Sequence, residues 1–250
     1  MHWLRSIAII LLTALLAGAV TPPINASYAP SNLPMPSIAQ HTILVWTPSV
    51  PITNPFSSVN YVTDGFFGYP QLAIYNYLTG AYVPILARNW TEDPAAGTLI
   101  IYIRKGLSWY NGSATMPFTA WDAYAYFYID NKAFAAFVPF INQNSTGIRV
   151  LNNYTLQIKF QQWSVQEIIY ILTSFMSTPW QVYKPIVEAL QGMNDSQALT
   201  YGTTDVVHFV PPFWFLSPYY VAKIAPPVIE YKLEPPNLLA AWDSIFPYHT

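Results

Sequence analysis

The stretch that decides the fold is residues 98–122, TLIIYIRKGLSWYNGSATMPFTAWD. Thr98–Arg104 alternates in side-chain character and is rich in β-branched residues, which predicts a β-strand. Asn111-Gly112 is a strong turn signal because both residue types tolerate positive φ. Thr119 and Asp122 have the spacing of a capping box, so a helix begins there with its carboxylate at the positive end of the helix dipole. A strand, a turn and a capped helix therefore follow one another closely.

Comparable signals extend to both sides of this stretch. The capped helix is expected to run to about Phe137, before Pro139, and Asn152-Asn153 is expected to form the turn of a β-hairpin. Because strands and helices mix without strict alternation, the pattern predicts an α+β or mixed-sheet α/β unit. The further expected helices are Gln71–Leu78, Val165–Phe175 and Lys184–Leu190, and the further expected strands are Thr42–Thr47, Ile148–Leu151, Tyr154–Phe160, Tyr219–Ile224 and Val228–Leu233.

The N-terminus carries the one continuously apolar segment. Ile7–Val20 is a run of fourteen residues without a charge, and His2 and Arg5 precede it. A membrane-spanning helix needs about 20 apolar residues, so this run is too short to span comfortably. The basic start and the small residues Ala17 and Ala19 at the end of the run predict a secretory signal peptide over residues 1–26, with an uncleaved anchor as the alternative. The proline-rich residues 27–40 are expected to form an extended tether.

Composition narrows the functional classes. Hydrophobic residues make up 53% of the 250 residues and charged residues only 9%, against about 25% charged in an ordinary soluble domain. Asn, Ser, Thr and Pro interrupt the apolar residues after the N-terminal run, so the low charge does not imply a membrane protein. The net charge of −2, with only ten basic residues, argues against a nucleic-acid partner. Cysteine is absent, which excludes a disulfide framework, a catalytic thiol and a lipid-anchoring cysteine.

A set of glycosylation acceptors fits an extracellular chain. Six Asn-x-Ser/Thr sequons occur, and as a set they carry more weight than any one of them does. They begin at Asn25, Asn89, Asn111, Asn144, Asn153 and Asn194.

Templates for catalysis are missing. The chain has no Gly-x-Ser-x-Gly elbow and no glycine-rich phosphate loop, and none of its four histidines are spaced as a metal-binding pair on a helix. Asp122 and Asp130 lie eight residues apart on the expected helix and so share one face, but a helix cap and a solvated aspartate explain them more simply. We therefore expect neither an enzyme nor a cofactor.

Aromatic residues are abundant, at 17% of the chain. Core packing accounts for most of them. A second hypothesis applies to two aromatic clusters, Phe213-Trp214-Phe215 and Tyr219-Tyr220. In this hypothesis their aromatic faces line a cleft and pack on sugar rings or peptide side chains of a ligand.

Four motifs in order resemble one known family. Residues 82–90, YVPILARNW, resemble the "P-x-L-A-x-x-W" segment of the oligopeptide/dipeptide-type solute-binding proteins of ABC importers. Residues 98–107, TLIIYIRKGL, are similar to the family's "T-x-x-F-x-L-R-K-G-V". Trp109–Gly112 resembles "W/F-H-D-G", and Phe118–Asp122 resembles "F-T-A-E-D-V", although Asn111 and Trp121 depart from the pattern. Weaker similarity extends from about His41 to Pro236.

The resemblance implies a class II periplasmic-binding-protein-like fold, in which two lobes close on a ligand. It places a partial first lobe at residues 41–236 and the start of a hinge or second lobe at 237–250, with the rest of the binding protein missing. It implies binding of a peptide or oligosaccharide outside the cell and delivery to the membrane subunits of an ABC permease, without covalent chemistry. The ligand contacts that it implies are Ser49, Val50, Pro51 and Asn54 after the first strand, and Phe137 and Phe140 after the capped helix.

Two alternatives come from other classes. The sequons and the low charge also fit a surface-layer or adhesive glycoprotein domain. A secreted glycoside hydrolase would need two carboxylates converging from different elements, and no motif in the chain indicates such a pair.

Overall fold

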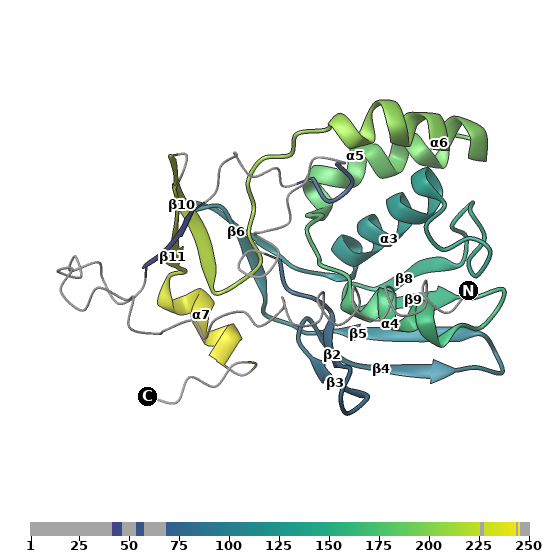
Figure 1. The fold of residues 1–250 in the computed structure, drawn as a ribbon, viewed down its shortest axis with the longest axis horizontal. Helices are drawn as coiled ribbons and strands as arrows, with labels where there is room; N and C mark the ends of the chain where they lie inside the picture. The colour runs from purple at the N-terminus through teal and green to yellow at the C-terminus, as the bar shows by residue number, and fades with distance from the viewer. Residues whose placement is uncertain (1–41, 47–53, 58–68, 226–227, 244, 246–250) are drawn as a thin grey trace, which may run out of the picture. The chain divides into compact units, whose positions relative to one another are not determined.

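The computed structural model describes residues 42–46, 54–57, 69–225, 228–243 and 245. These residues all fall within the unit Gln40–Thr250, and Figure 1 shows their arrangement. The strands are β1 (Thr42–Trp46), β2 (Ala73–Asn76), β3 (Ala81–Pro84), β4 (Ala87–Asp93), β5 (Thr98–Ile103), β6 (Ser108–Tyr110), β7 (Thr115–Pro117), β8 (Ile148–Asn152), β9 (Thr155–Lys159), β10 (Tyr219–Ala225) and β11 (Val228–Leu233). The helices are α3 (Ala120–Phe134), α4 (Val165–Thr173), α5 (Trp180–Gln191), α6 (Asp195–Thr204), the 3-10 turn η3 (Val206–His208) and α7 (Pro236–Asp243).

A four-stranded antiparallel sheet in the order β4-β5-β9-β8 forms the base of the larger layered part. In β5, Leu99, Ile101 and Ile103 are buried while the residues between them are half-buried. This alternation is the period-2 pattern that the sequence predicted, because successive side chains of a strand point to opposite faces. The β8–β9 hairpin also agrees with the prediction, and its turn is held by a hydrogen bond from the Tyr154 amide to the Asn152 side chain at 3.0 Å.

Helix α3 starts at the predicted capping box. The Thr119 backbone amide donates to Asp122 Oδ2 at 2.6 Å, and the Trp121 amide donates to Thr119 Oγ1 at 3.3 Å. The helix ends at Phe134, three residues before the predicted end, because Ala135 adopts the left-handed conformation with φ 54°. Figure 1 shows α3 between the four-stranded sheet and the pair α5 and α6, and the buried side chains of this three-layer arrangement form the main core.

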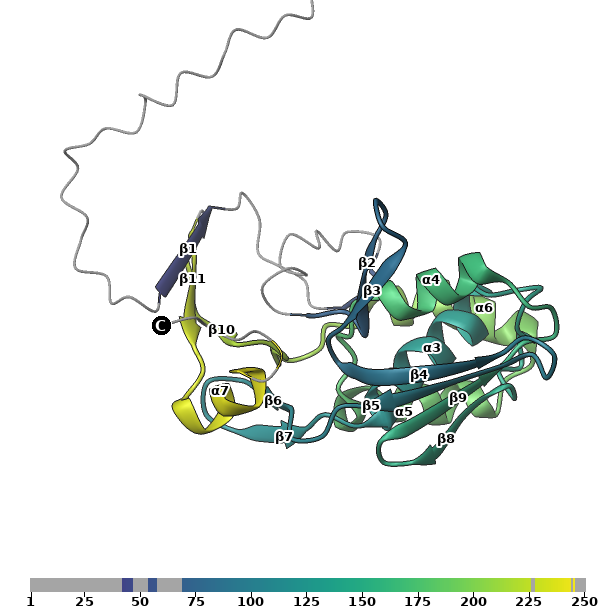
Figure 2. The ribbon, with the colours of Figure 1, turned by 90° about the horizontal axis from the view of Figure 1, so that it is seen from below.

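A second sheet pairs the two ends of the described chain. Its strand order is β1-β11-β10, and Thr42 of β1 lies opposite Lys232 of β11. Figure 2 shows β1 beside β11 and α7 next to β10. The strands predicted at Thr42–Thr47, Tyr219–Ile224 and Val228–Leu233 are all confirmed. The antiparallel hairpin β6–β7 meets the chain just before β10 through a bridge between Tyr110 and Phe215.

The helix predicted at Gln71–Leu78 is wrong. This segment enters the two-stranded hairpin β2–β3, in which Ala73 lies opposite Pro84 and Asn76 opposite Ala81. The turn is made by Asn76, whose side chain accepts from the Leu78 amide at 2.9 Å, and by Gly80, which has φ 69°. Pairing between aromatic side chains, with Tyr75 and Tyr82 ring centroids 4.7 Å apart, stabilises the strand form over the helix.

The predicted helices at Val165–Phe175 and Lys184–Leu190 correspond to α4 and to part of α5. Helix α6 was not predicted, although Asn194 and Gln197 form a second capping box at its start.

Trp90 is only half-buried, packed on Tyr82. Among the described residues, no helix has the length and apolar character needed to cross a membrane. The predicted signal peptide and tether lie outside the described residues.

Candidate functional site

The loop after β1 is the first element of the candidate ligand-binding face. Ser49, Val50 and Pro51 lie outside the described residues, but the tight turn at residues 54–57 is described. The Ser57 amide closes this turn on the Asn54 carbonyl at 3.2 Å. The Phe56 amide also donates to Asn54 Oδ1 at 3.1 Å. Asn54 therefore determines the shape of the turn through both its main chain and its side chain.

Asn54 also ties this turn to a distant part of the chain. Its Nδ2 donates to the Val206 carbonyl at 2.6 Å and to the Phe209 carbonyl at 3.0 Å. The Asn54 side chain is fully buried, so every polar atom of the amide is used inside the protein. The structure thus places Asn54 where it fixes the loop after β1 against the segment that leads to β10.

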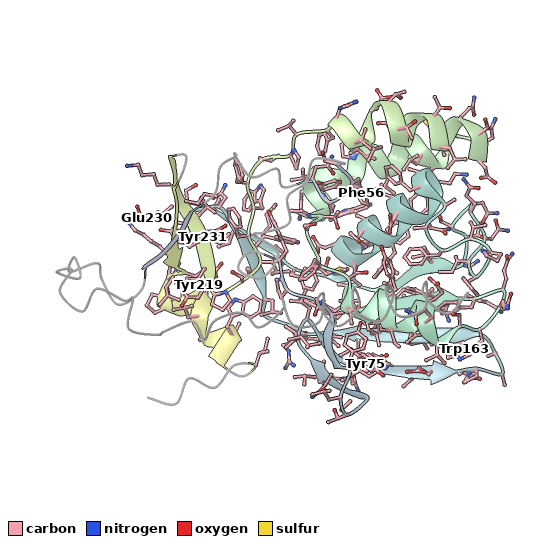
Figure 3. The ribbon with its side chains drawn as sticks, in the orientation of Figure 1. Phe56, Tyr75, Trp163, Tyr219, Glu230 and Tyr231 are labelled. Atoms are coloured by element: carbon pink, nitrogen blue, oxygen red, sulfur yellow. The ribbon has the colours of Figure 1, made fainter. Side chains whose placement is uncertain are left out.

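Phe56 brings the same loop onto the end of α3. Its ring stacks on Tyr126 and on Phe134, with centroids 5.7 Å apart in both pairs, and meets the edge of Tyr183 at 6.1 Å. Figure 3 shows Phe56 beside α5 and α3. Phe134 is the last residue of α3, three residues before the predicted contact Phe137. The loop after β1 and the end of α3 are therefore on the same side of the helical layer.

The two phenylalanines predicted as ligand contacts occupy different environments. Phe137 is fully buried and packs on Phe127 at 6.0 Å and on Tyr170 at 5.5 Å, so its own ring offers no exposed surface. Phe140 is half-buried, and its carbonyl accepts from the Gln161 amide at 2.7 Å. For all six predicted positions, the role of ligand contact stays a prediction.

The aromatic segment before β10 forms the second element of the face. Phe215 is buried and stacks on Tyr69 at 5.8 Å and on Phe213 at 6.2 Å. Main-chain hydrogen bonds join Phe215 and Tyr110 in both directions, at 2.8 and 2.9 Å. The Tyr110 ring meets the edge of Tyr220 at 4.9 Å. The half-buried members of this group, which retain some exposed ring surface, are Tyr110, Phe213, Trp214, Tyr219 and Tyr220.

Glu234 directly follows β11 and lies near Tyr110 of this aromatic group. It is only 3% exposed, and its main-chain amide donates to the Pro218 carbonyl at 2.9 Å. Burial raises the pKa of Glu234 to about 8, an effect that its interaction with Trp242 of α7 partly offsets. The same carboxylate helps to raise the pKa of Tyr110, after burial and Tyr220. At neutral pH Glu234 is therefore mostly protonated, as expected of a buried acid.

The two carboxylates of α3 have structural partners. Asp122 is 1% exposed and accepts from Trp109 Nε1 at 2.9 Å and from the Trp180 amide at 2.8 Å, in addition to its cap. Burial outweighs these bonds and raises its pKa to about 6. Burial likewise raises the pKa of Asp130 to about 6, and its partner is the Tyr170 hydroxyl at 3.5 Å. Among the described residues, no three His, Asp or Glu side chains gather in a way that would hold a metal ion.

Sequence reasoning missed Tyr69, Tyr110 and Glu234 as members of this face. No local pattern marked these residues, because long-range contacts place them: Phe215 stacks on Tyr69 and forms a bridge with Tyr110, and Glu234 is buried directly after β11.

The mixed strands and helices of the described residues have a periplasmic-binding-protein-like fold. No family model matches the chain. A probable ABC transporter-binding protein from Deinococcus radiodurans is 27% identical over 139 residues, which cover 53% of this chain and 23% of that protein. The chain is thus similar to an ABC transporter-binding protein, as the sequence motifs predicted.

One solved structure, with a TM-score above 0.5, shows the same fold, and two others are similar to the chain. HbpA2 from Haemophilus parasuis superimposes with a TM-score of 0.52 at 15% identity, covering 79% of this chain and 39% of that one. An oligopeptide-binding protein from Thermotoga maritima with bound mannohexaose gives 0.49 at 22% identity, covering 72% and 30%. The periplasmic binding protein DppA from Helicobacter pylori, in complex with the peptide STSA, gives 0.47 at 14% identity, covering 72% and 36%. The chain spans well under half the length of each of these proteins.

Proposed function

We propose that the protein binds a peptide or an oligosaccharide outside the cell and delivers it to an ABC permease. The observation that carries this proposal is the similarity to an ABC transporter-binding protein over 139 residues, in a chain whose mixed sheet and helical layer have the binding-protein fold. The relatives described above give no support to the surface-layer or the hydrolase alternative.

In the proposed mechanism, ligand is enclosed between this lobe and a second one, and the closed form docks on the membrane subunits. The loop after β1, with Ser49, Val50, Pro51 and Asn54, and the segment with Phe137 and Phe140 contribute to the ligand-facing side. Among the described positions of this set, Asn54 and Phe137 are buried and would position the loops, whereas Phe140 is half-buried and would contact the ligand. Half-buried aromatic residues of the segment before β10, such as Trp214, would add contact surface.

The same proposal places the protein on the outer side of the membrane as a glycoprotein. Its N-terminal residues 1–26 would act as a signal peptide and 27–40 as a tether. Support comes from the sequons, because all five sequon asparagines in the described part of the chain are exposed: Asn89, Asn111, Asn144, Asn153 and Asn194. An attached glycan is bulky and needs such a surface position.

Thermal-shift screening of the full-length protein tests the binding proposal. A ligand present at 100 times its Kd stabilises the folded state by about 2.7 kcal/mol, so a peptide or oligosaccharide that binds raises the unfolding midpoint. Trp214→Ala should weaken that binding at least about tenfold. Trp163→Ala is the matched control, because Trp163 is also half-buried but packs on Phe160, at 5.4 Å, on another part of the lobe (Figure 3). Equal affinity losses in both variants, or a panel without any stabilising compound, would contradict the proposal.

A further inference from the structure

One sequon lies at a pocket that the proposed solute-binding function does not use. The pocket has a volume of about 460 Å³. One side is a stripe of α3 formed by Tyr124, Tyr128 and Lys132, which are four residues apart and so lie on one face of the helix. The opposite side is the loop before β8, where Asn144 and Thr146 of the sequon Asn-Ser-Thr are themselves lining residues, next to Arg149.

The loop that carries this sequon has an unusual conformation. Ser145, the middle residue, has φ 59°, which is uncommon for a residue other than glycine. Its side chain is buried, donates to the Gln143 carbonyl at 3.2 Å and accepts from Asn131 Nδ2 at 3.0 Å. Because Ser145 is turned into the protein, its two neighbours are presented at the pocket. Strained backbone that the surroundings hold in place is found preferentially at functional sites.

The two outer residues of the sequon are already in contact. Thr146 Oγ1 and the Thr146 amide both donate to Asn144 Oδ1, at 2.9 and 3.1 Å. Both bonds use the oxygen of the Asn144 amide, so they leave its nitrogen available. That nitrogen is the atom to which a glycan is attached.

The pocket has the chemical character of a sugar site. The rings of Tyr124 and Tyr128 lie 5.2 Å apart and supply apolar surface. Gln191 also lines the pocket and hydrogen-bonds Tyr124. Arg149 is held by a bond from its Nε to the Thr146 carbonyl at 3.0 Å. Lys132 is largely neutralised by Asp195 at 2.7 Å. Aromatic surface with a few oriented amide and guanidinium groups is how proteins bind polar small molecules.

We propose that Asn144 carries an N-linked glycan whose first sugar residue is seated in this pocket, against Tyr124, Tyr128 and Arg149. In the attachment step, Asn144 Nδ2 forms a bond to the anomeric carbon of a lipid-phosphate-linked glycan. The bond from that carbon to the phosphate oxygen breaks, the lipid phosphate leaves with the electron pair, and the amide loses one proton. This inference rests on the glycoprotein part of the proposed function, and it is independent of which ligand the lobe binds.

Glycopeptide mass spectrometry of the full protein from its own cells is the first test. Asn144 should be occupied. If other sequons carry glycans and Asn144 does not, the proposal of a glycan seated in this pocket is wrong, while the glycoprotein proposal stands. If no sequon carries a glycan, both proposals are wrong.

Enzymatic deglycosylation of the native protein is the second test, followed site by site. Asn89 is the reference, because it is an exposed sequon on the edge strand β4 and is not a lining residue of this pocket. The Asn144 glycan should be released at least about tenfold more slowly than the Asn89 glycan, since a seated sugar must first leave the pocket, and denaturation should abolish the difference. Arg149→Ala should speed release at Asn144, whereas Lys159→Ala, which removes another exposed cation, should not. Equal native release rates at the two sites would overturn the proposal.

Discussion

Replacement of Asn54 by alanine should destabilise the protein strongly, because one buried amide joins two loops. Its Nδ2 bonds to Val206 and Phe209 and its Oδ1 bond to the Phe56 amide are all lost. Each such bond contributes about 0.5–1.5 kcal/mol net, and a buried partner left without one costs more. We therefore expect the free energy of unfolding to fall by about 2–4 kcal/mol. In a protein of this size that corresponds to a midpoint about 5–15 °C lower.

Thermal and urea unfolding of the wild type and the variant measure this loss. Asn76→Ala is the matched control, because Asn76 also accepts amide bonds in a turn, from Leu78 and Thr79, but is exposed. Exposed substitutions of this kind usually change stability by no more than about 0.5 kcal/mol. A loss at Asn54 as small as that at Asn76 would refute the role given to Asn54 as the tie between the loop after β1 and the segment before β10.

Three further predictions concern other parts of the chain. Thr119→Ala removes the cap of α3 and should lower the free energy of unfolding by about 1 kcal/mol in denaturant titrations, with ligand affinity unchanged; a large affinity loss at constant stability would place this segment in the binding site instead. The pKa of Glu234 is raised from 4.5 to about 8, so the folded state holds a proton that the unfolded chain releases, and unfolding free energy should fall as pH rises from about 4.5 to about 8. At about 1.4 kcal/mol per pH unit, this fall in unfolding free energy reaches at most about 5 kcal/mol. Glu234→Gln should reduce the fall, and an unchanged pH dependence of stability in the variant would show that Glu234 does not cause it. Mass spectrometry of the secreted protein should find a mature N-terminus after the apolar run, and one at Met1 would instead support an anchor.

Sequence signals predicted correctly the helices and hairpins that are held by contacts between residues close together in the sequence. The capping box of Thr119 and Asp122 predicted the start of α3 to the residue, since both partners lie within one helical turn. The turn at Asn152-Asn153 predicted the β8–β9 hairpin for the same reason. The helix expected at Gln71–Leu78 failed because periodicity in a short apolar run does not distinguish a helix from a strand, and because cross-strand contacts such as Tyr75 on Tyr82 decide the outcome.

The candidate site depends on contacts that no local pattern contains. The partners of Asn54 lie 152 and 155 residues further along the chain, and Phe215 pairs with Tyr110, which lies more than a hundred residues earlier in the chain. Resemblance of motifs identified the scaffold, and it directed attention to Asn54. It did not indicate that Asn54 would be buried, because burial follows from how the segment before β10 returns over the loop.

Native mass spectrometry of the full-length protein, incubated with a panel of peptides and oligosaccharides, tests the proposed ligand binding most directly. At least one compound should form a one-to-one complex and be recovered chemically unchanged, as expected of a binding protein that encloses its ligand without covalent chemistry. A protein that binds none of them, or that returns a cleaved compound, would contradict the proposal.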